Sequence, residues 1–140
     1  MQKVSIAGLL ILLLLASCKK DSDETQIRNR INEMALAIEA KNGREFVNYL
    51  DEQFQDQDGR TRKKIRAMLA VIFLQNKTIK VNYQIDALKL VDNTAQVSIH
   101  VTSSDGYLVG FRASRVSIQS LWKKTNGEWA LYRARWARTD

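Results

Sequence analysis

The spacing of apolar residues changes near residue 76, and this change constrains the fold more than any other feature. Before it, apolar side chains recur three or four positions apart, which is the spacing of one helix face. After it, they recur at every second position, which is typical of strands. Examples are Ile27, Ile31, Met34 and Ile38 before the change, and Ile79, Val81, Tyr83 and Ile85 after it. The order predicts an α+β fold with the helices first.

Turn residues divide the two halves into elements. The helices are predicted over residues 25–41, 44–54 and 60–75, with Asn42-Gly43 ending the first. The strands are predicted over residues 79–87, 97–101, 108–124 and 128–138, with turns at 91–94, Asp105-Gly106 and Asn126-Gly127. Three N-terminal helices would therefore pack on one face of a four-stranded antiparallel sheet.

The N-terminus has the pattern of a secretory leader that ends in a lipid-attachment site. A basic start with Lys3 precedes an apolar run from Val4 to Ala16, which is shorter than the ~20 residues of a membrane-spanning helix. The run ends in Leu15-Ala16-Ser17-Cys18, which resembles the lipobox of bacterial lipoproteins. In that family the cysteine thiol is alkylated with diacylglycerol and the leader is cleaved just before it.

This resemblance implies a signal peptide over residues 1–17, a lipidated tether over 18–24 and a folded domain over 25–140. Cleavage would separate Ser17 from Cys18, whose acyl chains would hold the protein on a membrane. Lys19 stands where an aspartate favours inner-membrane retention in enterobacteria, so the expected location is the outer membrane, facing the periplasm. The alternative is a buried, inert cysteine in a hydrophobic helix.

Composition argues against several kinds of site. The one cysteine cannot form an intramolecular disulfide, and one cysteine with one histidine argues against a Cys/His zinc site. The net charge of +7 suits anionic lipid or nucleic acid. A secreted, lipidated protein rarely meets nucleic acid, so we expect no such partner and no cofactor. The basic run over residues 60–66 is interpreted as a solvated helix face, with a phosphate or acidic-lipid site as the alternative.

The order of elements and the motifs near the C-terminus resemble the nuclear transport factor 2-like superfamily. The motifs are Lys41-Asn42-Gly43 followed by Phe46 and Leu50, then Leu121-Trp122-Lys123-Lys124, Asn126-Gly127-Glu128-Trp129-Ala130-Leu131 and Trp136. The resemblance implies a strongly curved sheet that forms a conical pocket closed by the helices. One departure is that no clear strand lies between the second and third predicted helices, although a short one could lie near Phe54.

The Asn126-Gly127 turn predicts which residues face each other in the last hairpin. With Thr125 opposite Glu128, the predicted pairs on one face are Trp122 with Leu131, Ser120 with Arg133, and Ile118 with Arg135. In the resembled superfamily this face lines the pocket. Arg133, Arg135 and Ser120 are therefore predicted to contact a small anionic or amphipathic ligand. The alternatives are arginines paired with helix carboxylates or exposed to solvent, and a β-bulge would exchange the two faces.

The other face is predicted to carry Leu121, Tyr132 and Trp136. Aromatic side chains exposed on a sheet face suggest an interface, and the resembled superfamily often pairs through this face. The sequence therefore predicts a homodimer interface at these residues. Packing beneath a loop is the alternative.

His100 is the one candidate for acid–base chemistry near neutral pH. Its polar neighbours favour a surface strand residue, and the catalytic motifs of ketosteroid isomerase or scytalone dehydratase cannot be matched here. The preferred function is thus a membrane-anchored, non-catalytic module that binds a small ligand or another protein. The alternative is a pocket enzyme of the isomerase or hydro-lyase type.

Overall fold

The structure is a computed structural model that describes residues 20–103, 107–108, 111–112 and 115–139. The predicted leader over residues 1–17, the lipidation site at Cys18 and the turn at Asp105-Gly106 lie outside these residues. Within the described part of the chain, no helix has both the length and the apolar composition needed to cross a bilayer.

Three helices form where the helical spacing predicts them: α1 (Asp23–Glu39), α2 (Gly43–Asn48) and α3 (Arg62–Gln75). Ser22 caps α1, because its Oγ accepts a hydrogen bond from the backbone N–H of Thr25 at 3.2 Å. Asn42 caps α2 in the same way through the N–H of Glu45, at 3.0 Å. The second helix is shorter than predicted, because the chain leaves it after Asn48 and becomes a strand.

The sheet has five strands and is mixed, where four antiparallel strands were predicted. Its spatial order is β1-β7-β6-β3-β2, with the bounds β1 Leu50–Asp56, β2 Val81–Val91, β3 Thr94–Ser103, β6 Arg115–Thr125 and β7 Glu128–Arg138. The added strand β1 lies parallel to β7, and the other neighbours are antiparallel. The prediction of a helix to residue 54 was wrong because Leu50 and Phe54 lie four positions apart. One helix face and one strand face both accept that spacing.

Two further short strands, β4 (Tyr107–Leu108) and β5 (Phe111–Arg112), pair with each other. They replace the first part of the long strand predicted over residues 108–124, so β6 begins only at Arg115. At its other end the last hairpin turns as predicted. Thr125 faces Glu128, and the turn residues Asn126 and Gly127 have φ values of 52° and 78°, as the favoured two-residue hairpin turn requires.

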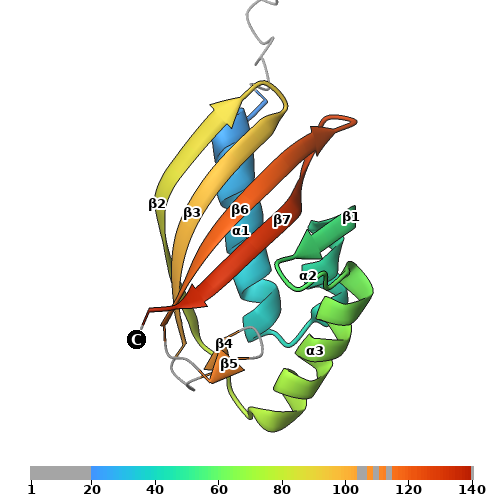
Figure 1. Ribbon diagram of the computed structural model, residues 1–140, viewed down its shortest axis with the longest axis vertical. Helices are drawn as coiled ribbons and strands as arrows, with labels where there is room; N and C mark the ends of the chain where they lie inside the picture. Colours follow the sequence, from blue (N-terminus) through green and yellow to red (C-terminus); the bar gives the residue numbers. More distant parts are fainter. Residues whose placement is uncertain (1–19, 104–106, 109–110, 113–114, 140) are drawn as a thin grey trace, which may run out of the picture.

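The strands curve around α1, and α2 and α3 lie at the lower end of the sheet (Figure 1). The core lies between the helices and the concave face of the sheet. Its most deeply buried large side chains are Trp122, Trp129, Ile27, Val97 and Val116. This arrangement leaves one sheet face in the core and the opposite, convex face toward solvent.

Candidate functional site

The concave face encloses an apolar cavity of about 150 Å³ between the sheet and the helices. Its walls come from all three helices and from strands β1, β2, β3, β6 and β7. Apolar side chains on its helical side include Ile31, Ile38, Leu69 and Phe73, and those on its sheet side include Ile99, Ile118, Trp122 and Trp136. The cavity thus lies between the apolar faces of the helices and the apolar face of the sheet.

Ser120 and Tyr83 supply the side-chain hydroxyl groups of the lining that the structure describes, and Trp122 and Trp136 add their indole nitrogens. The Ser120 hydroxyl donates to the carbonyl of Val97 at 2.9 Å and accepts from the indole N–H of Trp122 at 3.1 Å. The Tyr83 hydroxyl donates to Oδ1 of Asn32 at 3.2 Å. Both hydroxyls are therefore engaged with protein groups. An engineered apolar cavity of about 150 Å³ in another protein stays dry and binds benzene.

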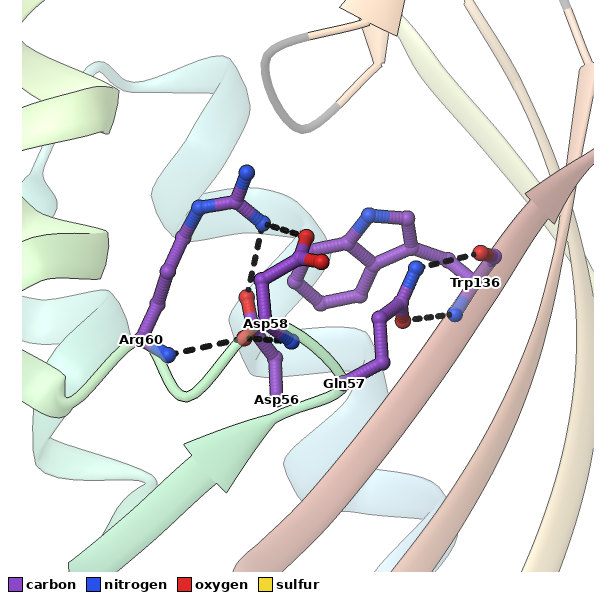
Figure 2. A network of polar contacts seen from close by, with 5 residues as sticks. All are labelled: Asp56, Gln57, Asp58, Arg60 and Trp136. Carbon is purple, nitrogen blue, oxygen red and sulfur yellow. Dashed lines mark hydrogen bonds and ion pairs between the residues drawn. The ribbon is translucent and has the colours of Figure 1, made fainter.

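Trp136 is placed in the cavity wall by a side chain outside the core. The side-chain amide of Gln57 donates to the carbonyl of Trp136 at 2.8 Å and accepts from its N–H at 2.7 Å (Figure 2). These two bonds continue the pairing between β1 and β7 by one more step, beyond the backbone pair Asp56–Ala134. A lone glutamine gives no sequence signal for this role, so sequence reasoning missed it.

The loop that follows β1 is closed by a buried carboxylate. Asp56 accepts hydrogen bonds from the N–H groups of Asp58 and Arg60, both at 2.8 Å, and pairs with the Arg60 guanidinium at 3.0 Å (Figure 2). The hydrogen bond that the Arg60 guanidinium donates to the Asp56 carboxylate raises the pKa of Arg60. Arg60 thus belongs to a structural ion pair. Lys63, Lys64 and Arg66 of the same basic run are exposed, as expected for a solvated helix face.

A β-bulge overturns the predicted register of the last hairpin beyond Trp122. Trp122 faces Leu131 as predicted, but Leu121 then faces Arg133, and Ser120 faces Ala134. Tyr132 is the extra residue, so every later residue of β7 changes face. Gln119 faces Arg135, and Ile118 faces Trp136. Of the three residues predicted to contact a ligand, Ser120 lines the cavity, whereas Arg133 and Arg135 are absent from its wall.

Arg133 is held on the convex side of the sheet. Its Nη1 donates to the carbonyl of Gln53 at 2.8 Å, and its guanidinium lies 3.8 Å from the centre of the Tyr132 ring. Lys123 lies 3.5 Å from the same ring centre. Arg135 is exposed. The premise that put these arginines near a pocket was therefore wrong, because it assumed a regular hairpin.

The bulge also divides the residues predicted for a dimer interface. Leu121 and Tyr132 are half-buried, and Tyr132 is partly covered by the two cations described above. Trp136 is only 8% exposed and belongs to the core. These residues therefore do not form one apolar surface, and a dimer through the convex face stays a prediction.

A second bulge brings Asp86 to His100. Ile85 faces Ile99 and Ala87 faces Ser98, which leaves Asp86 as the extra residue of β2. Its carboxylate contacts Nδ1 of His100. The pair lies on the convex face, where His100 belongs to a shallow polar hollow with Asn82, Gln84 and Thr102. His100, the alternative catalytic residue, thus lies on the sheet face opposite the cavity, and Tyr83 is the residue that lines both the hollow and the cavity as the structure describes them.

Two other titratable groups are shifted by their surroundings. Hydrogen bonds from Lys124 and Trp129 lower the pKa of Asp23, at distances of 2.8 and 3.0 Å from its Oδ1. Burial, reinforced by a hydrogen bond to Glu45, raises the pKa of Tyr49. Neither residue lines the cavity. Within the described ranges, no group of three His, Cys, Asp or Glu residues could hold a metal ion.

Neither family models nor curated proteins match the sequence of this chain. Solved structures match its fold. A cystatin-like domain of unknown function from Nostoc punctiforme superposes with a TM-score of 0.70 at 19% identity, over 86% of this chain and 80% of that one. A nuclear transport factor 2-like protein from Cytophaga hutchinsonii gives 0.66 at 13% identity, over 85% and 100%.

A protein from Novosphingobium aromaticivorans that is provisionally named scytalone dehydratase gives a TM-score of 0.64 at 14% identity, over 84% of each chain. At these identities the likeness concerns the fold alone. The chain has the α+β fold of nuclear transport factor 2-like and cystatin-like proteins, as the resemblance of its sequence implied.

Proposed function

We propose that this protein is a lipid-anchored envelope protein whose domain binds a small apolar group in the cavity. The single observation that carries the binding proposal is the lining of the cavity. It combines a volume of about 150 Å³ with largely apolar walls whose two hydroxyl groups, those of Ser120 and Tyr83, are already hydrogen-bonded. Removing apolar surface from water contributes about 25 cal/mol per Å², so such a wall favours aliphatic or aromatic groups over charged ones.

The anchoring half of the proposal is supported by the leader and by Cys18. Diacylglycerol on the cysteine, with a further acyl chain, gives the two signals that stable anchoring needs. The lysine at residue 19 supports an outer-membrane location. Expression of the full chain in a bacterium fed a labelled fatty acid tests this. Label and the acylated mass should appear in the native protein and be lost in Cys18→Ser.

An enzyme of the isomerase or hydro-lyase type remains the alternative. Such chemistry needs an acid or base within hydrogen-bond reach of the substrate. Among the lining residues that the structure describes, Tyr83 is the one titratable side chain, and its hydroxyl already bonds to Asn32. The fold of the Novosphingobium protein is compatible with either function. The chemistry of the lining therefore favours binding.

Filling the cavity tests the binding proposal. Ala35 lies on α1 and lines the cavity, so Ala35→Leu should occupy part of its volume. Ala70 on α3 is exposed, which makes Ala70→Leu the matched control. Benzene at saturation should raise the unfolding temperature of the native protein. The rise should be several-fold smaller in Ala35→Leu. Ala70→Leu should keep the full shift.

Two results would overturn the proposal. One is an unfolding temperature that neither benzene nor a short alkanol raises in the native protein. The other is an equal benzene shift in Ala35→Leu and Ala70→Leu, since binding would then occur outside the cavity. Native mass spectrometry of the purified protein would show in addition whether a small molecule accompanies it from the cell.

A further inference from the structure

We infer that the turn between β2 and β3 touches the membrane beside the lipid anchor, so that the domain stands with its cavity end pointing away from the bilayer. This inference rests on the proposed lipidation of Cys18. The proposed partner is the surface of the bilayer. It would contact an exposed apolar tip, formed by Leu90 and Val91, and thereby orient the domain.

The length of chain between the anchor and the domain limits where the membrane can be. Four residues lie between Cys18 and Asp23, the first residue of α1, and the five steps of chain from Cys18 to Asp23 span at most about 17 Å when fully extended. The helix itself has 17 residues and is about 25 Å long. The end of the domain at Asp23 is therefore held near the membrane, and the opposite end of α1 is beyond the reach of the tether.

Both hairpin turns lie at this same end of the molecule, as the top of Figure 1 shows. The two turns are joined directly, because the N–H of Lys124 donates to the carbonyl of Asn93 at 2.9 Å. The start of α1 is fixed to them by the bonds from Lys124 and Trp129 to Asp23, at 2.8 and 3.0 Å. The helix start and the two turns thus move as one body relative to the anchor.

The β2–β3 tip carries apolar side chains that no core contact explains. Leu90 is 39% exposed and Val91 is 58% exposed, although neighbours in a strand normally point to opposite faces and only one of them would face water. Lys89 beside them is exposed, and Lys20 precedes α1. Adjacent apolar and basic side chains suit the boundary of a membrane with anionic lipid.

The tip is too small to hold the protein on a membrane without the anchor. Two partly exposed side chains bury little area, whereas a short tether gives an effective concentration on the order of millimolar. The anchor therefore supplies the attachment, and the tip supplies the orientation. The cavity lies toward the other end, since its wall includes Val81 at the start of β2 and Trp136 near the end of β7. Its ligand would then exchange with the aqueous side.

A fluorescent label at the tip tests this orientation in the native, acylated chain. Acylation converts the sulfur of Cys18 into a thioether, so Val91→Cys introduces the sole reactive thiol. The matched control is Leu74→Cys on the outer side of α3, which is 89% exposed. Each labelled protein is placed in phosphatidylcholine–phosphatidylglycerol vesicles that contain a lipid-borne quencher. We expect the label at position 91 to be quenched several-fold more than the label at position 74.

Each outcome decides between the two proposals. An intact mass without acyl chains would overturn the anchoring proposal and, with it, this inference. An acylated protein whose two labels are quenched equally would overturn the orientation alone. Stronger quenching at position 74 would also overturn it, since the domain would then rest on the exposed Val71 and Leu74 of α3.

Discussion

The two faces of the sheet are built from the same strands and differ sharply in character. The concave face carries buried side chains such as Val97, Trp122 and Trp136 and encloses the cavity. The convex face carries charged or polar side chains such as Asp86, His100 and Arg135. Each β-bulge adds one residue and thereby decides which side chains fall on which face. The chemistry of the candidate site is set as much by these two bulges as by the residues themselves.

Insertion of an alanine between Tyr132 and Arg133 should have the largest effect on this division. With one more residue after the bulge, β7 would turn Arg133 and Arg135 toward the core and Trp136 toward solvent, unless its pairing with β6 broke. A buried charge without a partner costs several kcal/mol, and the whole domain is stable by about 5–15 kcal/mol. We expect the insertion variant to lose cooperative urea unfolding followed by tryptophan fluorescence.

The control for this insertion is Tyr132→Ser, which keeps the number of residues in β7. It removes the ring between Lys123 and Arg133, a loss of about 1 kcal/mol. If the insertion variant were as stable as Tyr132→Ser, the number of residues at the bulge would have no part in separating the two faces.

Truncation of one side chain on each face should give the next largest difference in the free energy of unfolding. Trp122 is 1% exposed, and Trp122→Ala should reduce the free energy of unfolding by about 3–5 kcal/mol because it leaves a hole in the core. Arg135 is exposed on the convex face, and Arg135→Ala should change it by less than about 0.5 kcal/mol. Equal losses in urea titrations of the two variants would contradict the assignment of the faces.

The sequence predicted the fold well where local signals sufficed. Helical spacing located α1 and α3, and Asn126-Gly127 located the last turn and the pair Trp122–Leu131. The sequence-based prediction failed where pairing between distant segments of the chain decides the secondary structure. β1 is a strand because it lies beside β7, more than seventy residues later in the chain, and nothing within Leu50–Asp56 distinguishes that strand from a helix end.

The candidate site was predicted only in part, because the pairing of β6 with β7 was only partly predicted. Ser120 was correctly predicted to lie on the cavity side. The extra residue is on β7, so the alternation of side chains along β6, which carries Ser120, stays regular. Arg133 and Arg135 follow Tyr132 on β7, so one unforeseen residue moved both to the other face. A bulge has no fixed residue signature when its extra residue is a tyrosine, since a glycine in the left-handed region is the common marker.

Removal of the Gln57 side chain should have a smaller effect, limited to one edge of the cavity. Its two bonds hold the backbone of Trp136, but Gln57 is exposed and water can replace part of them. Gln57→Ala should therefore reduce the free energy of unfolding by about 1 kcal/mol and shift the emission of Trp136. Gln55→Ala, at an exposed position of β1 just before Gln57, should do neither. Identical emission spectra in both variants would show that β1 holds Trp136 without the amide.

The smallest expected effect concerns Asp23, which joins the start of α1 to the sheet through Lys124 and Trp129. Its pKa is lower in the folded protein than the ordinary value of 3.8, so the ionised carboxylate favours the folded state. That contribution is complete above the unfolded value and is lost as the pH falls through the lower folded value. Asp23→Asn should therefore flatten the decline of stability below about pH 4. Asp21→Asn, at an exposed position just before the helix, should leave the decline unchanged. Urea midpoints measured between neutral pH and pH 2 would compare the three proteins, and parallel curves would show that Asp23 does not stabilise this end of the domain through its charge.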